Sequence, residues 1–182
     1  MRLYLVRHGE SDANVAGIIN DDPRRPVHLT SQGRQQAKAV ALALQGIAFR
    51  QVYVSRFPRT RQTAEIVLAA LGLDLPIRED GRLDERRSGL DGQPVEVFNG
   101  LVRPDPVHLR PGLGETFLEQ MTRVRGFLDD AAARHPADAV LAVSHENPIN
   151  AVAAVASLDP EVAARRVLGN CEWIVVDWAG AE

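Results

Sequence analysis

Two apolar runs, each followed directly by a histidine, constrain the fold of this chain more than any other feature. Leu3–Val6 is followed by Arg7 and His8, and Ala139–Ser144 is followed by His145. Such runs are typical of parallel strands that are buried on both faces. In open α/β sheets, ligands bind where the chain leaves the carboxyl ends of the strands. We therefore expect the two histidines to face each other across one crevice.

Helical and strand patterns alternate along the rest of the chain. Thr30 offers an N-cap for one helix, and Pro58 suits the first turn of a second. Thr116 and Glu119 form a capping box for a third. This alternation predicts a three-layer α/β fold, with a mostly parallel central sheet and helices on both faces, in a single domain over residues 1–182. The predicted strands cover residues 3–6, 51–55, 76–78, 139–144 and 172–178, and the predicted helices cover 35–45, 58–71, 116–135, a segment from about 149 and a short segment at 159–160.

Composition narrows the functional classes. The 182 residues are 45% hydrophobic and 25% charged, and the net charge of -3 gives no reason to expect nucleic acid or an anionic membrane as a partner. No apolar run reaches spanning length, and the first strand starts too close to Met1 to leave room for a signal peptide. We therefore expect a cytoplasmic protein. Cys171 is the only cysteine, which excludes an intramolecular disulfide and favours a packed thiol.

The first histidine suggests phosphoryl transfer, because in Arg7-His8 a neutral nucleophile lies beside a cation. Gly9 would let the backbone turn sharply beside the imidazole. Arginine binds phosphate well, but Lys38 is the only lysine among 21 basic residues, so the position of an arginine matters and its abundance does not. Arg59 falls in the first turn of a helix, where unpaired N–H groups already favour an anion. We therefore expect Arg59 to face a bound anion.

Polar segments elsewhere hold further candidates. Glu85 lies in a dense charge cluster, which by default is a solvated face, but a carboxylic acid here could be the general acid for a leaving alkoxide. Asn14 could donate its amide to a bound anion or close a turn, and the turn is the more usual role. Residues 92–114 are rich in proline and long for a connection, which is typical of a lid or substrate loop. Four arginines are unassigned candidates for substrate contact: Arg86, Arg87, Arg103 and Arg110.

Short blocks of residues are spread over nearly the whole chain. They are Arg7–Ser11 with Asn14, Leu29–Thr30 with Gly33 and Gln36–Ala37, Ser55 with Arg59 and Gln62–Ala64, Leu83 with Glu85 and Gly89, Pro111 with Gly114–Thr116, and Ser144–His145. In this order the blocks resemble the histidine phosphatase superfamily, the phosphoglycerate-mutase-like proteins. Each block alone is a weak match, but the whole set in this order is specific for that superfamily.

The resemblance implies a role for each matching residue. His8 looks like the nucleophile that becomes phosphohistidine, and Arg7 and Arg59 look like its phosphate clamp. His145 looks like the second histidine of the pocket, and Glu85 like the acid that protonates the leaving group and later helps to activate water. No metal and no cofactor is implied, because the arginines do the work that magnesium does in kinases. The remaining implied phosphate or substrate contacts are Asn14, Ser11 and Arg86.

Two positions depart from the pattern that the family often shows. Glu146 stands where many members have glycine, and Asn150 stands where many have arginine. A carboxylate beside His145 could raise the pKa of that histidine or reject acidic substrates. The chain between Glu85 and His145 is also short, which resembles the phosphatases of the family more than its mutases.

The sequence therefore predicts a metal-independent phosphomonoesterase that acts on a small phosphorylated metabolite through phospho-His8. A cofactor-dependent phosphoglycerate mutase with the same site is the nearest alternative, and a binding protein that senses phosphorylated ligands is a further one. A zinc hydrolase is disfavoured, since Ile149 stands where a zinc helix of the His-Glu type needs its second histidine. The expected partner is the phosphate ester, and the chain could form a homodimer.

Overall fold

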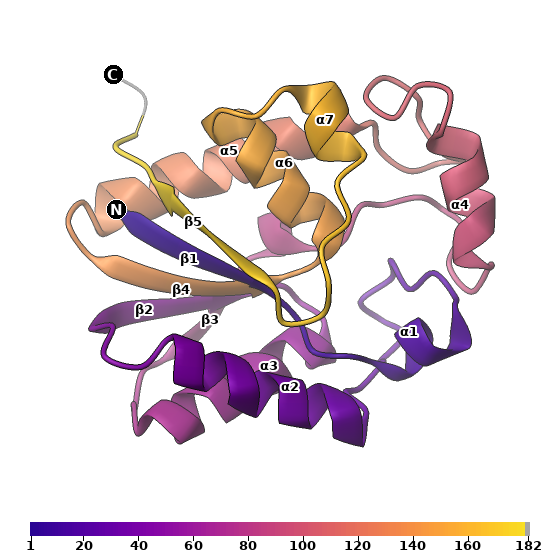
Figure 1. The fold of residues 1–182 in the computed structure, drawn as a ribbon. Coiled ribbons are helices and arrows are strands. Elements are labelled where there is room, and N and C mark those ends of the chain that lie inside the picture. Colours follow the sequence, from indigo (N-terminus) through magenta and orange to yellow (C-terminus); the bar gives the residue numbers. More distant parts are fainter. Residues whose placement is uncertain (181–182) are drawn as a thin grey trace.

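One mixed sheet lies at the centre of residues 1–180, which the computed structural model describes (Figure 1). Its strands are β1 (Arg2–Arg7), β2 (Phe49–Val54), β3 (Ile77–Glu79), β4 (Ala139–Ser144) and β5 (Trp173–Asp177). They lie in the order β3-β2-β4-β1-β5. Neighbours among the first four are parallel, whereas β5 runs antiparallel to β1. The prediction of a mostly parallel sheet is confirmed, and the reversed edge strand is an addition to it.

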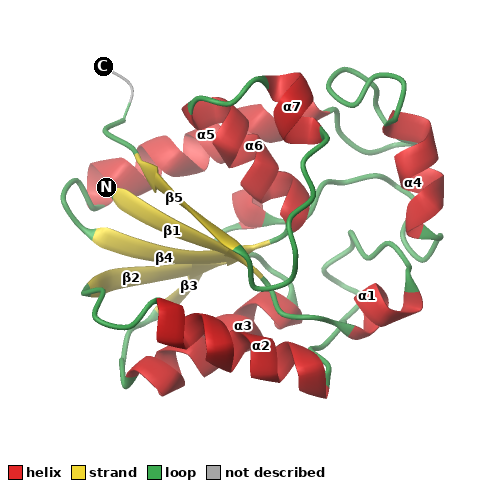
Figure 2. Ribbon diagram, viewed as in Figure 1, coloured by secondary structure: helices red, strands yellow, loops and turns green. Residues whose placement is uncertain are grey.

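Helices cover both faces of this sheet, and two shorter helices stand beyond the carboxyl ends of its parallel strands (Figures 1 and 2). The helices on one face are α2 (Ser31–Ala43) and α3 (Pro58–Leu71); those on the other are α5 (Phe117–Arg134), α6 (Glu146–Ala156) and α7 (Pro160–Ala164); those beyond the strand ends are α1 (Asp12–Ala16) and α4 (Val95–Val102). The predicted three-layer arrangement is confirmed. Within residues 1–180, no helix is both long and apolar enough to cross a membrane.

Side-chain alternation along β1 contributes to two separate cores. Leu3 and Leu5 belong to the core that includes Phe117 and Phe127 of α5. Val6 belongs to the core on the opposite face, with side chains of α2 and α3. Successive side chains of a strand point to opposite faces, so a strand that is buried on both sides needs apolar residues at every position. This double burial explains the continuous apolar run near the N-terminus.

The predicted helix starts are present. The hydroxyl of Thr30 accepts a hydrogen bond from the Gly33 amide at 3.0 Å, and Thr116 and Glu119 form the reciprocal capping box of α5. Pro58 is the first residue of α3. The capping side chains accept hydrogen bonds from backbone amides of the first turn, which have no partner inside the helix. Proline has no amide hydrogen, so it leaves no such donor without a partner. These residues fix where each helix begins relative to the strand that precedes it.

Three helices differ from the sequence-based expectation, and one of them, α1, was not predicted at all. Residues 92–114, expected as a proline-rich lid or loop, contain the helix α4, and Pro94 stands at its N-cap. Proline is compatible with a helix start, so its presence in this segment did not exclude a helix. The helix α6 begins at Glu146 and not near 149, because His145 already serves as its N-cap residue.

Candidate active site

The carboxyl ends of β1 and β4 bring the two predicted histidines together. His8 follows β1 and His145 follows β4, and their ring centroids lie 5.1 Å apart. The amide of His8 donates to the carbonyl of Ser144 at 3.0 Å, which extends the ladder between these strands. Both residues are buried, with relative exposures of 3% and 0%. The two histidines thus lie together, as expected, and of the two only His8 lines the cavity described below.

Hydrogen bonds assign one tautomer to His8. Its Nδ1 lies 2.7 Å from the carbonyl oxygen of Gly9, and a carbonyl can only accept, so Nδ1 carries the proton. Nε2 therefore keeps its lone pair and accepts from Nε of Arg59 at 3.1 Å. Burial lowers the pKa of His8 well below 6.5, and the charges of Arg59 and Arg7 lower it further. Nε2 is unprotonated at neutral pH, as a nucleophile must be.

Gly9 permits a close backbone approach, and because its φ angle is not positive, the corner depends on the missing Cβ of this residue. A Cβ at Gly9 would lie 2.4 Å from the carbonyl oxygen of Gly33, and a Cβ at Gly33 would lie 2.0 Å from that of Glu10. The amide of Gly9 donates to Oγ1 of Thr63 at 3.1 Å. The corner after β1 is thus held by backbone contact with α2 and by a hydrogen bond to a side chain of α3.

Arg59 joins the two histidines. Its Nε donates to His8, and a terminal nitrogen donates to Nδ1 of His145 at 3.1 Å. The guanidinium also donates to the side chain and the carbonyl of Asn20, a partner that the sequence analysis missed, and lies 4.4 Å from the ring centroid of Phe57. Burial lowers the pKa of Arg59 to about 10, so the group stays charged at neutral pH. A fixed cation at the start of α3 suits a phosphoryl dianion.

His145 carries its proton on the other ring nitrogen. A guanidinium can only donate, so Nδ1 of His145 accepts from Arg59, and Nε2 carries the proton and donates to Oγ of Ser55 at 2.8 Å. Burial lowers the pKa of His145 well below 6.5, and Arg59 and His8 add to this effect. The ring is therefore neutral at neutral pH, and a phosphate dianion beside it would favour its protonation.

Arg7 is paired with Glu146, the acid that departs from the family pattern. A terminal nitrogen of Arg7 lies 2.9 Å from Oε2 of Glu146 and also donates to the carbonyl of Leu168. Burial raises the pKa of Glu146, and the charge of Arg7 opposes that rise. The sequence suggested that this carboxylate could perturb His145, but its direct charged partner is the expected phosphate clamp.

Glu85 lies in the loop that follows the 3-10 turn Gly81–Leu83. One carboxylate oxygen accepts from the amide of Arg86 at 2.7 Å, and the side chain of Asn147 is a second partner. Burial raises the pKa of Glu85, while the Arg86 amide and the charge of Arg59 oppose the rise. A raised pKa keeps a proton available for a leaving group, which is the property that a general acid needs.

Two contacts that the sequence analysis missed hold this loop. Arg123 of α5 donates to the carbonyl of Glu85 at 3.2 Å and pairs at 2.7 Å with Glu115, which is 2% exposed. The hydroxyl of Ser144 donates to the carbonyl of Leu83 at 2.6 Å. An arginine in the middle of a helix is ordinarily solvated, so the sequence carried no signal for Arg123. The loop is fixed to α5 on one side and to β4 on the other.

The three remaining predicted contacts line the cavity but have partners within the protein. Ser11 and Asn14 form the capping box of α1, in which Oδ1 of Asn14 accepts from the Ser11 amide at 3.0 Å. A short helix therefore replaces the turn expected at Asn14. The guanidinium of Arg86 is buried, and its donors hold the proline-rich segment through the carbonyls of Pro106, Leu109 and Glu115.

A cavity of about 610 Å³ opens over these side chains. We call its predicted catalytic part the inner end, which contains His8, Arg7, Arg59, Glu85 and Glu146. We call the opposite part the outer wall, which is formed by Ile18, Ile19, Val95, Phe98, Val102 and Arg103. Residues 92–114 thus supply α4 to the cavity, and their role as a substrate segment stays a prediction. Burial raises the pKa of the Cys171 thiol to about 12, which agrees with a packed cysteine.

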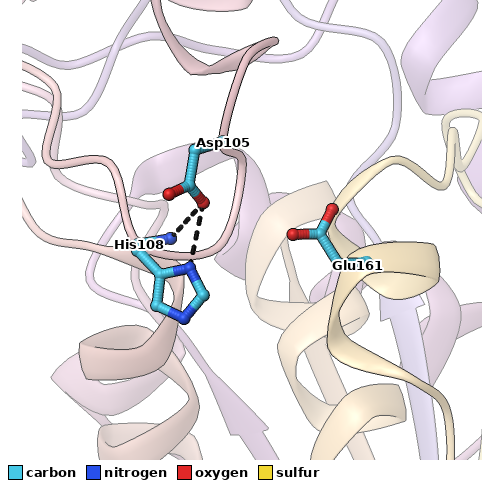
Figure 3. A group of neighbouring side chains, drawn as sticks. All are labelled: Asp105, His108 and Glu161. Carbon is cyan, nitrogen blue, oxygen red and sulfur yellow. Dashed lines mark hydrogen bonds and ion pairs between the residues drawn. The ribbon is translucent and has the colours of Figure 1, made fainter.

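Asp105, His108 and Glu161 form one group of neighbouring metal-type ligands among the described residues (Figure 3). One Asp105 oxygen accepts from the amide of His108 at 2.9 Å and lies 3.0 Å from its Nδ1. Glu161 pairs with Arg165 at 3.3 Å. Each of the three side chains thus has a partner within its own segment.

Known proteins resemble this chain in sequence over most of its length. Residues 3–182 match a family model described as the histidine phosphatase superfamily, branch 1. The chain is 30% identical over 190 residues to the probable phosphoglycerate mutase GpmB of Cronobacter sakazakii, covering 98% of this chain and 85% of that protein. It is 33% identical over 159 residues to the adenosylcobalamin/alpha-ribazole phosphatase of Salmonella typhimurium, covering 82% of this chain and 76% of that protein.

A solved structure also resembles it. The alpha-ribazole phosphatase from Shigella flexneri superposes with a TM-score of 0.82 at 26% identity, covering 97% of this chain and 90% of that one. The family match spans nearly the whole chain, and it includes the strand ends that carry both histidines. The chain therefore belongs to the histidine phosphatase superfamily.

Proposed function

We propose that this hydrolase cleaves a small phosphomonoester in two steps through a phosphohistidine at His8. The observation that carries the proposal is the state of His8 Nε2, which is unprotonated and lies against Arg59 beside His145 at the inner end. A phosphoryl group in transfer spreads charge over three oxygens, so fixed cations stabilise its transition state. Arg7 and Arg59 supply this charge, and the proposed steps therefore need no metal ion.

The two steps use Glu85 first as an acid and then as a base. In the first step, Nε2 of His8 attacks phosphorus, the N–P bond forms, and the bond from phosphorus to the alcohol oxygen breaks. Glu85 gives its proton to that oxygen, so a neutral alcohol leaves. In the second step, the Glu85 carboxylate takes a proton from water, the water oxygen attacks phosphorus, and the N–P bond breaks. Inorganic phosphate leaves and Nε2 regains its electron pair.

Rapid-quench labelling with a ³²P phosphate ester tests the intermediate. We expect label on the protein that survives alkali and is lost in acid, and no label on His8→Ala, whose turnover should fall by at least about 10⁴-fold. Turnover of His8→Ala at the wild-type rate would refute the proposal. For Glu85→Gln, we expect a much larger loss on alkyl phosphates than on p-nitrophenyl phosphate, whose leaving group needs no proton. Equal losses on both esters would remove Glu85 from the role of general acid.

A phosphoglycerate mutase is the second candidate, because one relative is named as a probable mutase. A mutase would return the phosphoryl group to the other hydroxyl of the substrate, and a phosphatase passes it to water. Product analysis with 3-phosphoglycerate separates the two. We expect free phosphate to exceed the isomer, and isomerisation that outpaces phosphate release would favour the mutase.

A further inference from the structure

The carboxylate of Glu146 lies at the inner end of the cavity, in the first turn of α6. Its Oε2 lies 2.9 Å from Arg7, and its Oε1 accepts from the amide of Leu168 at 3.4 Å. The side chain is 26% exposed and lines the cavity together with Arg7. A ligand that is bound by Arg7 therefore lies close to this carboxylate.

The inner end has acids to match its cations. Arg59 and Arg7 are the cations, and Glu85 and Glu146 are the acids. Arg59 already donates to both histidines and to Asn20, and Arg7 is already paired with Glu146. The α6 side chains that complete this lining are uncharged, namely Asn147 and Asn150. A phosphate group engages both cations, so a second anionic group held directly beside Arg7 would meet the carboxylate of Glu146.

Four other arginines line the cavity. One of them, Arg166, lies in the segment after α7, where its carbonyl accepts from Asn150 at 2.8 Å, so an anionic group that extends toward that segment meets a cation. The donors of Arg86 are bound to three carbonyls, and Arg165 is exposed and paired with Glu161. Arg103 is exposed and follows the end of α4, on the outer wall. An anionic group at the far end of a long ligand could reach Arg103. The effect of Glu146 is thus confined to groups that lie within a few bonds of the phosphate.

We infer that Glu146 is a specificity-determining residue, which favours phosphomonoesters with a hydroxyl or ammonium group near the phosphate and disfavours those with a carboxylate or second phosphate there. This inference rests on the proposed function, because it assumes that the ester phosphate binds at Arg7 and Arg59. Like charges repel strongly at partial burial, whereas a hydroxyl or ammonium group can donate to the carboxylate.

The charged groups around Glu146 predict how this preference depends on pH. Arg7 faces it from the end of β1, Glu85 from its loop, and Glu172 from the residue before β5. Burial and the two acids raise the pKa of Glu146, whereas Arg7 opposes them. Protonation removes the repulsive charge, so the preference should weaken as the pH falls.

Two matched ligands test the inference. Glycerol 3-phosphate and 3-phosphoglycerate share a three-carbon skeleton and differ in a hydroxymethyl group against a carboxylate. Calorimetric titration of the His8→Ala protein measures binding of each without turnover. With Glu146 present, we expect glycerol 3-phosphate to bind about tenfold more tightly. With Glu146→Gln added, this ratio should fall severalfold, mainly through tighter binding of 3-phosphoglycerate. Glu172→Gln is the control, since Glu172 also acts on Glu146 but does not line the cavity, and it should leave the ratio unchanged.

Three outcomes overturn the inference: equal or tighter binding of 3-phosphoglycerate to the protein that retains Glu146, a ratio that Glu146→Gln does not change, or no binding of either ester while p-nitrophenyl phosphate is hydrolysed. The first outcome comes from the protein with Glu146 unchanged, so it holds even where Glu146→Gln fails to fold. The proposed function is judged separately. If p-nitrophenyl phosphate is not hydrolysed but the ratio behaves as expected, the hydrolysis fails and the inference about Glu146 stands.

Discussion

The inner end and the outer wall of the cavity are built from different kinds of contact. At the inner end, Arg59 bonds to both histidines, and the loop of Glu85 is held by Arg123 and by Ser144. On the outer wall, Val95, Phe98 and Val102 of α4 are apolar, and Arg103 is exposed. Several polar contacts fix each inner group, whereas these three outer side chains pack through apolar surface. We therefore expect the chemistry and the selectivity of Glu146 for groups near the phosphate to lie at the inner end, and the selectivity for the rest of the substrate to lie on the outer wall.

Replacing Arg59 with lysine should lower the activity of the inner end more than the other changes described below. Lysine keeps the charge, but a single ammonium cannot reproduce the planar set of donors to His8, His145 and Asn20. We expect kcat/KM to fall by about 10³-fold on every phosphate ester, the upper scale of losing one donor to a developing oxyanion. Arg61→Lys is the control, because Arg61 lies on the same helix but pairs with a surface acid. A loss below about tenfold for Arg59→Lys would contradict its assigned role.

Replacing Arg123 with glutamine should loosen the inner end without touching a reacting atom. The change leaves the buried carboxylate of Glu115 without its main partner, so the free energy of unfolding should fall by about 3 kcal/mol in urea titrations. Because Arg123 holds the Glu85 loop, hydrolysis of alkyl phosphates should slow about tenfold, and that of p-nitrophenyl phosphate should slow less. The exposed Arg125, changed to glutamine, is the control. Equal slowing of both esters would argue against a positioning role.

Lowering the pH should reduce the free energy of unfolding, because the two buried histidines of the site are held neutral in the folded protein. Burial and Arg59 hold the pKa values of His8 and His145 well below 6.5 in the folded protein. Below pH 6.5 the unfolded chain therefore binds more protons than the folded one, so stability falls as the pH falls. The slope approaches about 1.4 kcal/mol per pH unit for each histidine. Urea titrations from about pH 7.5 to 5.5 measure it. His8→Asn should remove about half of the slope, and a slope that this variant leaves intact would refute the assignment.

A change on the outer wall should have the smallest effect on activity. It also tests whether the outer wall and the inner end act independently. Phe98→Ala removes an aromatic contact from α4, so KM for the preferred metabolite should change about three- to tenfold. Inhibition by inorganic phosphate, which reaches only the inner end, should stay the same. Val97→Ala is the matched control, because Val97 is on the same helix but does not line the cavity. A large change in the phosphate inhibition constant for Phe98→Ala would show that the two parts are coupled.

Much of the fold could be predicted from local pattern alone. The apolar run Leu3–Val6 and the capping residues Thr30 and Thr116 act through neighbours in the sequence, so their signals can be read directly. The direction of β5 could not be predicted, because strand orientation is set by contacts between distant segments. The helix α4 was hidden by the prolines around it, although Pro94 stands outside the helix.

The residues of the site can be separated in the same way, into those with a local sequence signal and those without one. His8 and His145 were found because each follows a buried strand, and Arg59 because it stands at a helix start. Their exact roles stay predictions until they are tested. Asn20 and Arg123 had no local signal, since each acts through a partner far away in the chain.

The backbone contact between Gly9 and Gly33 limits how this protein can change over time. Gly33 lies on α2 and touches no part of the cavity, yet any side chain there collides with the carbonyl of Glu10. A complete library of single substitutions, selected for activity, should therefore show Gly33 as an intolerant position in addition to the buried core positions of α2. New substrate ranges are then most accessible through mutations of α4, while the two glycines stay invariant in every surviving lineage.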